Sequence, residues 1–126
     1  MNVPGDLFYT ATHEWVRFTD DGFALAGLTD HAQETLGDLA YINLSCAAGD
    51  TVTAAQAMGE VESIKAVTDI NAPVSGTVAA VNEQTVEHPE QINADPYGAW
   101  LVKIGPYEPN PDLLDALAYE LLIAQE

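Results

Sequence analysis

Short strand-forming runs interrupted by glycine and proline are the feature that most restricts how this chain can fold. β-Branched and aromatic residues gather in brief segments, and turn-forming pairs such as Gly49-Asp50 and Ser75-Gly76 separate them. Many short strands with frequent turns are typical of a β-sandwich or a small barrel. A chain of 126 residues is long enough for one domain with a single core. We therefore expect one mainly β domain over residues 1–126.

The turn signals divide the chain into expected elements. Asp20-Asp21-Gly22 predicts a tight turn that joins two strands into a β-hairpin. Asp30 with Gln33 predicts a capping box and Gly37 a helix stop, so a short internal helix is expected over residues 30–36. A faint internal echo, Gly-Asp-Thr-Val at 49–52 and Ser-Gly-Thr-Val at 75–78, hints at two halves related by pseudo-symmetry. The segments expected to form strands are residues 9–18, 23–28, 39–44, 51–55, 58–62, 66–70, 77–81 and 100–104.

The C-terminal part predicts a second helix. Asn110 is expected to cap it, and Pro111 suits the first helical position. Residues 88–90 and 95–98 are expected to be loops, and Gly105-Pro106 is expected to end the last strand. The helix is expected to pack on the core through an apolar stripe formed by Leu113, Leu114, Leu117, Ala118, Leu121 and Leu122.

The charge balance restricts the partners. Twenty acidic residues stand against three basic ones, and the net charge of −17 repels nucleic acids and anionic membranes. The same charge favours partners with basic docking patches, although solubility or salt adaptation would also explain it. No apolar run is long enough to span a bilayer, and the residues from Met1 to Asp6 do not resemble a secretion signal. We expect a cytoplasmic protein.

The residues that commonly act in catalysis or bind metals form no recognisable catalytic or metal-binding motif in this sequence. Cys46 is the only cysteine and is expected to be a small buried hydrophobe. His13, His31 and His88 lie far apart, without metal-ligand spacing, so no metal site is expected. The sequence contains no phosphate-binding loop, dinucleotide fingerprint or nucleophile elbow. These observations argue against an enzyme.

Lys65 is one of two lysines, and strand-forming residues flank it on both sides. It is therefore expected at or near the tip of a hairpin, exposed to a modifying enzyme. The acidic neighbours Glu60, Glu62 and Asp69 would help to orient such an enzyme. The alternative is an ordinary surface lysine paired with Glu62. The other lysine, Lys103, lies in a buried strand pattern.

The segment from Glu62 to Asp69, Glu-Ser-Ile-Lys-Ala-Val-Thr-Asp, closely resembles the lipoylation segment of the glycine cleavage system H proteins. Ile64 and Ala66 replace the methionines of biotin carriers, and Ile64 replaces the aspartate usual in lipoyl domains of 2-oxo acid dehydrogenases. Thr12 stands where the family often has serine, and residues 98–100 lack a frequent acidic-glycine pair. Further runs resemble the family in order and spacing, at residues 8–10, 13–16, 27–33, 36–38, 72–76, 81–83, 95–98 and 113–116.

The resemblance implies a barrel-sandwich hybrid of the lipoyl/biotinyl-carrier type, with a short internal helix and a C-terminal helix. It implies a monomeric carrier with lipoic acid covalently attached to Lys65. The arm would receive the aminomethyl group of glycine from a pyridoxal-phosphate glycine decarboxylase and deliver it to a tetrahydrofolate-dependent aminomethyltransferase. Dihydrolipoyl dehydrogenase would reoxidise the arm, and a lipoate-attaching enzyme would be a further partner.

The resemblance also implies that Glu14 and Asp69 face a cleft where the loaded arm rests. The loaded arm carries a primary amine, which is cationic at neutral pH and would accept stabilisation from carboxylates through charge-assisted hydrogen bonds. The alternative is that Glu14 and Asp69 are solvated surface acids. Two other functions remain open, namely relay of lipoyl or octanoyl groups to other lipoyl domains and an unmodified acidic interaction domain.

Overall fold

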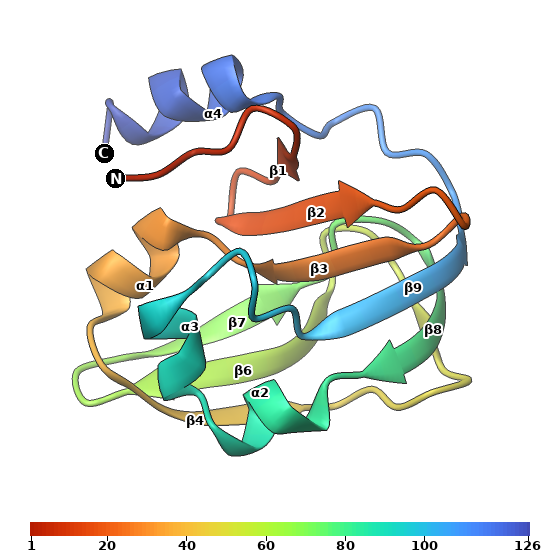
Figure 1. Cartoon of the computed structure of the whole chain (residues 1–126), viewed down its shortest axis with the longest axis horizontal. Helices are drawn as coiled ribbons and strands as arrows, with labels where there is room; N and C mark the ends of the chain where they lie inside the picture. Colours follow the sequence, from red (N-terminus) through yellow and green to blue (C-terminus); the bar gives the residue numbers. More distant parts are fainter.

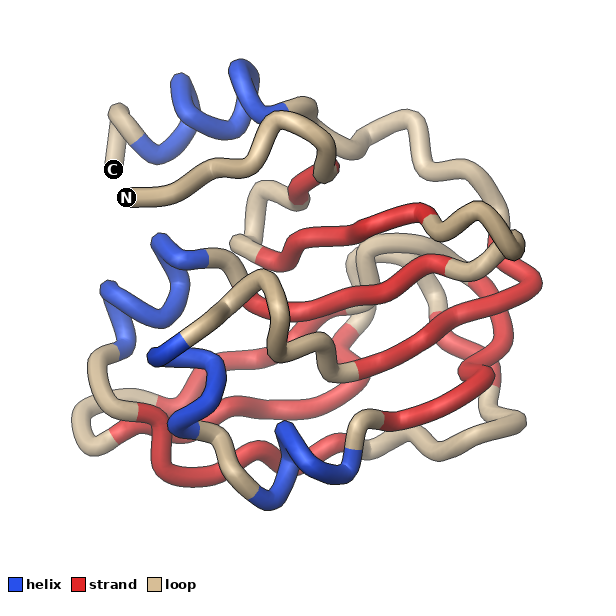
Figure 2. Tube along the Cα trace, viewed as in Figure 1, coloured by secondary structure: helices blue, strands red, loops and turns tan.

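The computed structural model describes residues 1–126 as two antiparallel β-sheets with short helices on the outside (Figures 1 and 2). The six-stranded sheet has the order β1-β2-β3-β9-β8-β5, and the three-stranded sheet has the order β4-β6-β7. The mainly β expectation is therefore confirmed. The strands are β1 Phe8–Tyr9, β2 Glu14–Phe18, β3 Ala24–Leu28, β4 Leu39–Leu44, β5 Thr51–Val52, β6 Ala57–Ser63, β7 Val67–Asn71, β8 Gly76–Val81 and β9 Val102–Tyr107.

The main core is aliphatic and draws its side chains from both sheets. Val16 and Ile104 of the larger sheet and Val61 and Ile70 of the smaller sheet are fully buried in it. More and less buried residues alternate along most of β9, as expected for a strand with one covered face. β2 buries consecutive residues, because Val16 packs in this core and Trp15 packs in a second cluster on the other face. The two segments of the internal echo pair directly, because β5 and β8 meet with Thr51 opposite Thr77.

The expected hairpin and internal helix are present. β2 and β3 pair antiparallel, and Gly22 in their turn has a φ of 90°, a conformation that favours glycine. Helix α1 spans Asp30–Leu36, as expected, and ends at Gly37. The expected cap was wrong by one residue, because Thr29 accepts the hydrogen bond from the Ala32 N–H. Asp30 instead accepts from the Gln33 side chain.

Several boundaries differ from the expectation. The first expected strand is two strands, β1 and β2, separated by a turn in which His13 has a φ of 73°. β9 continues through Gly105-Pro106 instead of ending there, because β3 pairs with β9 only as far as Ile104 and the irregular register with β8 leaves Pro106 without a paired residue. Two short helices, α2 Glu83–Glu87 and α3 Glu90–Ala94, were not expected, since they bury only Thr85 and Ile92 and show no apolar stripe.

The C-terminal helix α4 spans Ala116–Ile123 and begins later than expected. Asp115 caps it by accepting from the Ala118 N–H, whereas the Asn110 side chain donates to the Pro73 carbonyl. The expected leucine stripe was wrong, because Leu117 and Leu121 are 67% and 60% exposed.

The fully buried side chain of α4 is Tyr119, which stacks on Tyr9 with ring centroids 4.6 Å apart. It belongs to a second, mostly aromatic cluster that attaches α4 to the outer strands of the larger sheet. Leu7, Trp15 and Tyr97 complete that cluster.

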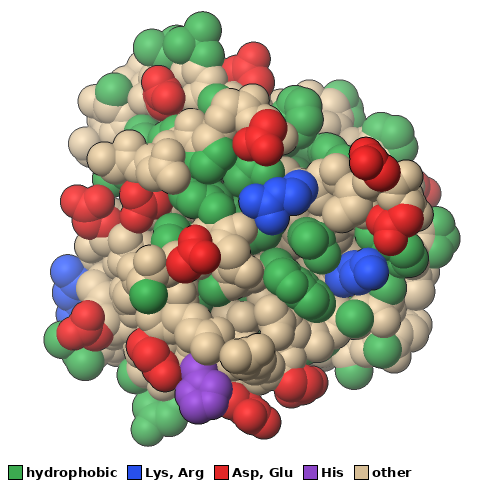
Figure 3. Space-filling model, viewed as in Figure 1, with side chains coloured by type: hydrophobic (Ala, Val, Ile, Leu, Met, Phe, Trp, Pro, Cys, Tyr) green, Lys and Arg blue, Asp and Glu red, His purple; other side chains and the backbone are tan.

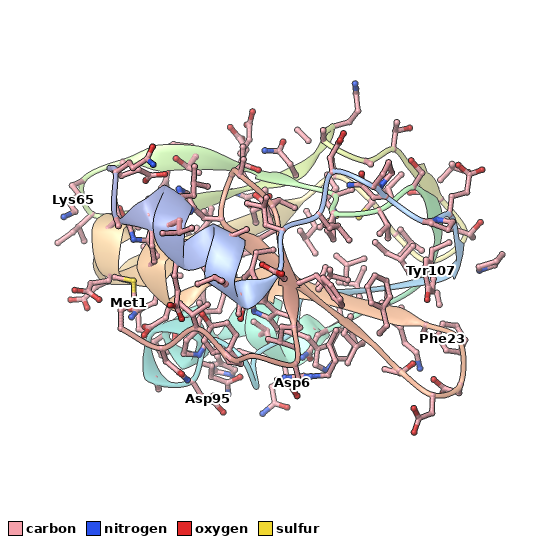
Figure 4. All side chains as sticks on the ribbon, turned by 90° about the horizontal axis from the view of Figure 1, so that it is seen from above. Met1, Asp6, Phe23, Lys65, Asp95 and Tyr107 are labelled. Atoms are coloured by element: carbon pink, nitrogen blue, oxygen red, sulfur yellow. The ribbon has the colours of Figure 1, made fainter.

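The β6–β7 hairpin ends at one extremity of the molecule. Figure 4 shows Lys65 at that end, whereas Phe23 and Tyr107 lie at the opposite end. Helix α1 lies beside the hairpin tip, and the two chain termini lie near each other above α1 (Figure 1). The fold thus places the lysine, α1 and the C-terminal segment in one region.

Candidate functional site

The tip of the β6–β7 hairpin is organised by one serine. Ser63, which is 7% exposed, accepts hydrogen bonds through Oγ from the N–H groups of Lys65 and Ala66 at 3.3 and 3.2 Å. The Ser63 N–H donates to the Ala66 carbonyl at 2.9 Å and closes the turn. The backbone of the lysine is therefore fixed by local contacts.

The side chains of the tip are free. Ile64 is 82% exposed, Lys65 is exposed, and the Lys65 ammonium makes no ion pair or hydrogen bond with the protein. A pair with Glu62, the ordinary alternative for this lysine, is not formed. The Lys65 stem passes over Gly37, where an added Cβ would lie 3.5 Å from Lys65 Cε.

Lys103 is held very differently. It lies half-buried on β9, between β3 and β8, and its Nζ is 4.3 Å from the centre of the Phe23 ring. A cation over an aromatic face is attracted by the ring's negative face. The two lysines of the chain thus differ in accessibility, and only Lys65 projects its amine freely from a turn.

A cavity of about 110 Å³ lies beside α1. Leu36, the residue before Gly37, is one of the residues that line it. Asp69 on β7 is one of the residues that line it, whereas Glu14 is not. The other lining residues are Thr12, His13, Leu28, His31, Ala32, Thr35, Leu36, Thr68 and Glu126. The cavity wall therefore combines residues of α1, β7, the β1–β2 turn and the C-terminal segment.

Glu14 is buried beneath this wall and is 1% exposed, so it is not a solvated surface acid. Its Oε1 accepts from the hydroxyls of Thr10 and Thr12, each at 2.6 Å, and its Oε2 accepts from the Asn71 N–H at 3.1 Å. Burial raises the pKa of the Glu14 carboxyl, and these donors oppose the rise by stabilising the anion. Asp69, in contrast, is exposed.

Two histidines and a glutamate meet at the same cavity, which the sequence did not lead us to expect. His13 Nε2 and His31 Nε2 each lie 3.1 Å from Glu126 Oε1. Burial lowers the pKa of His13, while Glu126 opposes that change. His88 stays apart, beside Glu90. The register of the β2–β3 hairpin could have predicted part of this cluster. Glu14 pairs with Leu28, and this pairing brings His13 next to Thr29 at the start of α1.

Comparison with known proteins assigns the family. Residues 7–125 match the family model described as "Glycine cleavage H-protein". The chain belongs to the glycine cleavage H-protein family. The H protein of Burkholderia ambifaria is 48% identical over 124 residues, covering 97% of this chain and 98% of that protein. The H protein of Halorhodospira halophila is 47% identical over 127 residues, covering 98% of this chain and 97% of that protein.

A solved structure supports the same assignment. The crystal structure of the glycine cleavage system H protein from Mycobacterium marinum has a TM-score of 0.84 and 41% identity, and the match covers 98% of each chain. The expected barrel-sandwich hybrid is therefore confirmed. No helix in the structure has both the length and the apolar character needed to cross a bilayer.

Membership in the glycine cleavage H-protein family fixes the general role. The chain is a lipoyl carrier of glycine catabolism and not an enzyme, and it carries lipoic acid on a lysine. Its partners are glycine decarboxylase, the aminomethyltransferase, dihydrolipoyl dehydrogenase and a lipoate ligase. The carrier shuttles the aminomethyl group of glycine between the first two enzymes, and the third reoxidises it.

Proposed function

We propose that Lys65 is the residue that carries the lipoyl group and that the loaded arm rests in the cavity beside α1. The observation that supports this most directly is the contrast between the two lysines. Lys65 presents a free amine from a fixed turn, whereas the Lys103 amine is held over Phe23. A ligase must reach the amine, and a carrier must hold the root of its arm in a defined place.

The residues around Lys65 fit an attached arm. The Lys65 stem crosses the end of α1 at Gly37, where even an added Cβ would lie at ordinary contact distance from Lys65 Cε, so the stem can lie along that surface. The cavity begins at the neighbouring Leu36. The lipoyl group supplies a disulfide that accepts the aminomethyl group and is reduced to a dithiol. The protein supplies the attachment point, the shelter and the docking surface.

Asp69 is proposed to hold the amine of the loaded arm directly, because its side chain lines the cavity. Glu14 is proposed to act through Thr12, whose hydroxyl donates to it while Thr12 itself lines the cavity. A charge-assisted hydrogen bond of this kind is worth about 1.5–3 kcal/mol when well desolvated. The two carboxylates therefore have different roles, one as a contact and one as a positioning residue.

Intact mass after incubation with lipoate ligase tests the assignment of the lysine. Lys65→Arg keeps the charge but cannot form the amide, and Lys103→Arg is the matched control. The wild type and Lys103→Arg should each gain the mass of one lipoyl group, and Lys65→Arg should gain none. Modification of Lys65→Arg would overturn the assignment.

Decay of the loaded arm in the absence of other enzymes tests the cavity. Asp69→Asn and Glu14→Gln should release formaldehyde and ammonia faster than the wild type. Glu60→Gln is the matched control, because Glu60 pairs with Asp69 across the hairpin but does not line the cavity. Wild-type decay in both cavity variants, with folding and lipoylation intact, would exclude these roles.

The acidic surface is proposed to steer the partner enzymes. Acidic side chains are scattered over the face shown in Figure 3, and basic ones are few. Exposed charges are screened within roughly 8 Å at physiological ionic strength, so association with the decarboxylase should slow as salt rises.

We also propose a cytoplasmic location, where tetrahydrofolate and NAD would be available to the partner enzymes. Cell fractionation would test it.

A further inference from the structure

His13, His31 and Glu126 form a cluster with the composition of a transition-metal site. Their three ligand atoms all lie within 4.8 Å of one another. Both imidazole Nε2 atoms are 3.1 Å from the same oxygen, Glu126 Oε1. The residues come from the β1–β2 turn, from α1 and from the C-terminal segment, so only the folded chain assembles them.

The spacing fits a shared ion. Zinc lies about 2.0–2.2 Å from imidazole nitrogen and carboxylate oxygen, so two ligands of one tetrahedral ion are separated by roughly 3.3–3.5 Å. The observed nitrogen–oxygen distances of 3.1 Å need a small expansion to admit it, and the two imidazole nitrogens, which lie within 4.8 Å of each other, must reach the same separation. Two imidazoles and one carboxylate also form a ligand set known for zinc in proteins.

Hydrogen bonds behind the cluster hold the His13 ring. Its Nδ1 is 2.8 Å from the hydroxyl of Tyr119, and that hydroxyl is 2.8 Å from Thr29 Oγ1. Tyr119 and Thr29 are both fully buried. A partner on the second ring nitrogen is typical of metal-binding histidines, because it orients the ring and raises its basicity. Thr29 also caps α1, the helix that carries His31.

We propose that His13, His31 and Glu126 bind a divalent cation of the zinc class. Three protein ligands leave one position of a tetrahedral ion open. The same three residues line the cavity beside α1, together with Thr12 and Asp69. The open position is thus available to a water or to a small ligand in the cavity. The site depends on this chain's own residues and is independent of the lipoyl assignment.

The imidazole ligands distinguish this site from general attraction of cations to an acidic protein. Carboxylates alone prefer hard cations such as Mg²⁺ and Ca²⁺, whereas imidazoles favour zinc, copper, nickel and cobalt. The chain offers an internal control in His88, whose Nδ1 lies 3.3 Å from Glu90 Oε1 on the exposed surface. No third ligand residue joins His88 and Glu90, so this pair serves as a surface control for the cluster of His13, His31 and Glu126.

Titration of the full, unlipoylated chain with ZnCl₂ and with CoCl₂ tests the proposal. We expect one zinc per chain by calorimetry, persistence of binding in excess MgCl₂, and the visible absorption of tetrahedral Co²⁺. His31→Asn and Glu126→Gln should each weaken zinc binding by at least about 10-fold, since loss of a supporting group alone costs on the order of 10–100-fold. His88→Asn should bind as the wild type does.

Glu126→Gln also guards against loss of folding, because Glu126 is exposed and a glutamine there disturbs no core contact. Absence of zinc binding in the wild type would overturn the proposal. So would displacement of zinc by MgCl₂, or an equal loss of affinity in His88→Asn and Glu126→Gln, since both results indicate adventitious binding by surface acids.

Discussion

The β6–β7 hairpin is held in opposite ways at its two ends. At the tip, Ser63 provides the contacts that fix the turn, and the side chains of Ile64 and Lys65 are exposed. At the base, Ile70 is fully buried and the Asn71 N–H donates to Glu14 of the other sheet. The lysine thus sits on the free end of an element that is anchored at its other end.

The base of the hairpin contributes to the stability of the fold, whereas the tip presents Lys65 to other proteins. Regions with few buried contacts open at low cost, whereas regions tied into the core open only with the whole fold. Changes at the base of the hairpin should therefore lower the free energy of unfolding. Changes at the tip should leave that free energy nearly unchanged and act on modification of Lys65.

The largest effect is expected from Glu14→Ala at the base. The substitution leaves the Asn71 N–H and the hydroxyls of Thr10 and Thr12 without their acceptor. Thr10 and Asn71 are partly buried and Thr12 is exposed, so water can replace part of the lost acceptor. A buried donor without a partner costs about 1–3 kcal/mol, so we expect a loss of about 2 kcal/mol. Urea unfolding followed by tryptophan fluorescence measures it. A loss below about 0.5 kcal/mol would show that Glu14 does not anchor the hairpin.

Glu14→Gln tests the base of the hairpin through the pH dependence of the free energy of unfolding. Burial raises the pKa of the Glu14 carboxyl from its ordinary value of 4.5, so between 4.5 and the raised value the folded state binds more protons than the unfolded state. The Glu14 contribution to stability therefore falls as pH rises through that window. The stability of Glu14→Gln relative to the wild type should increase from pH 4.5 upward and then level off. A pH-independent difference would contradict the burial effect.

Ser63→Ala tests the tip. It removes the acceptor for two N–H groups in the turn, but these groups lie near solvent and can bind water instead. We expect a loss of about 1 kcal/mol in unfolding free energy, within the range of one net hydrogen bond. Lipoylation should slow, because the turn no longer fixes the Lys65 backbone. Hydrogen exchange should rise at residues 64–66 and stay unchanged at Ile70.

The smallest effect on stability is expected from Lys65→Arg. The Lys65 ammonium contacts no partner, and surface substitutions away from structural features stay within about 0.5 kcal/mol. The same variant should lose all lipoylation. A matched thermal unfolding scan should coincide with that of the wild type, and a large drop in its melting temperature would mean that the tip supports the fold.

The features predicted correctly from the sequence depend on local signals. The Asp-Asp-Gly turn forms because Gly22 adopts its positive φ, and the hairpin follows from it. The exposed lysine follows from strand-forming residues on both sides of it. The family resemblance, at residues 62–69 and in further runs along nearly the whole chain, implied the fold and the role, which the comparisons confirm.

The features that were missed depend on contacts between distant residues. The leucines of α4 predicted the wrong face, because stacking of Tyr119 on Tyr9 decides which side of the helix is buried. The cluster of His13, His31 and Glu126 has no local spacing at all. Only the hairpin register and the docking of the C-terminal segment bring its members together.

The exposed tip has a practical consequence for proteolysis. Trypsin cleaves after basic residues, and this chain has three, Arg17, Lys65 and Lys103. Arg17 and Lys103 lie within β2 and β9, where cleavage requires the sheet to open, whereas Lys65 lies in an exposed turn. Brief digestion of the native protein should therefore nick the chain first after Lys65. Acylation of that amine removes the cleavage site, so a simple gel would report the modified fraction of a preparation.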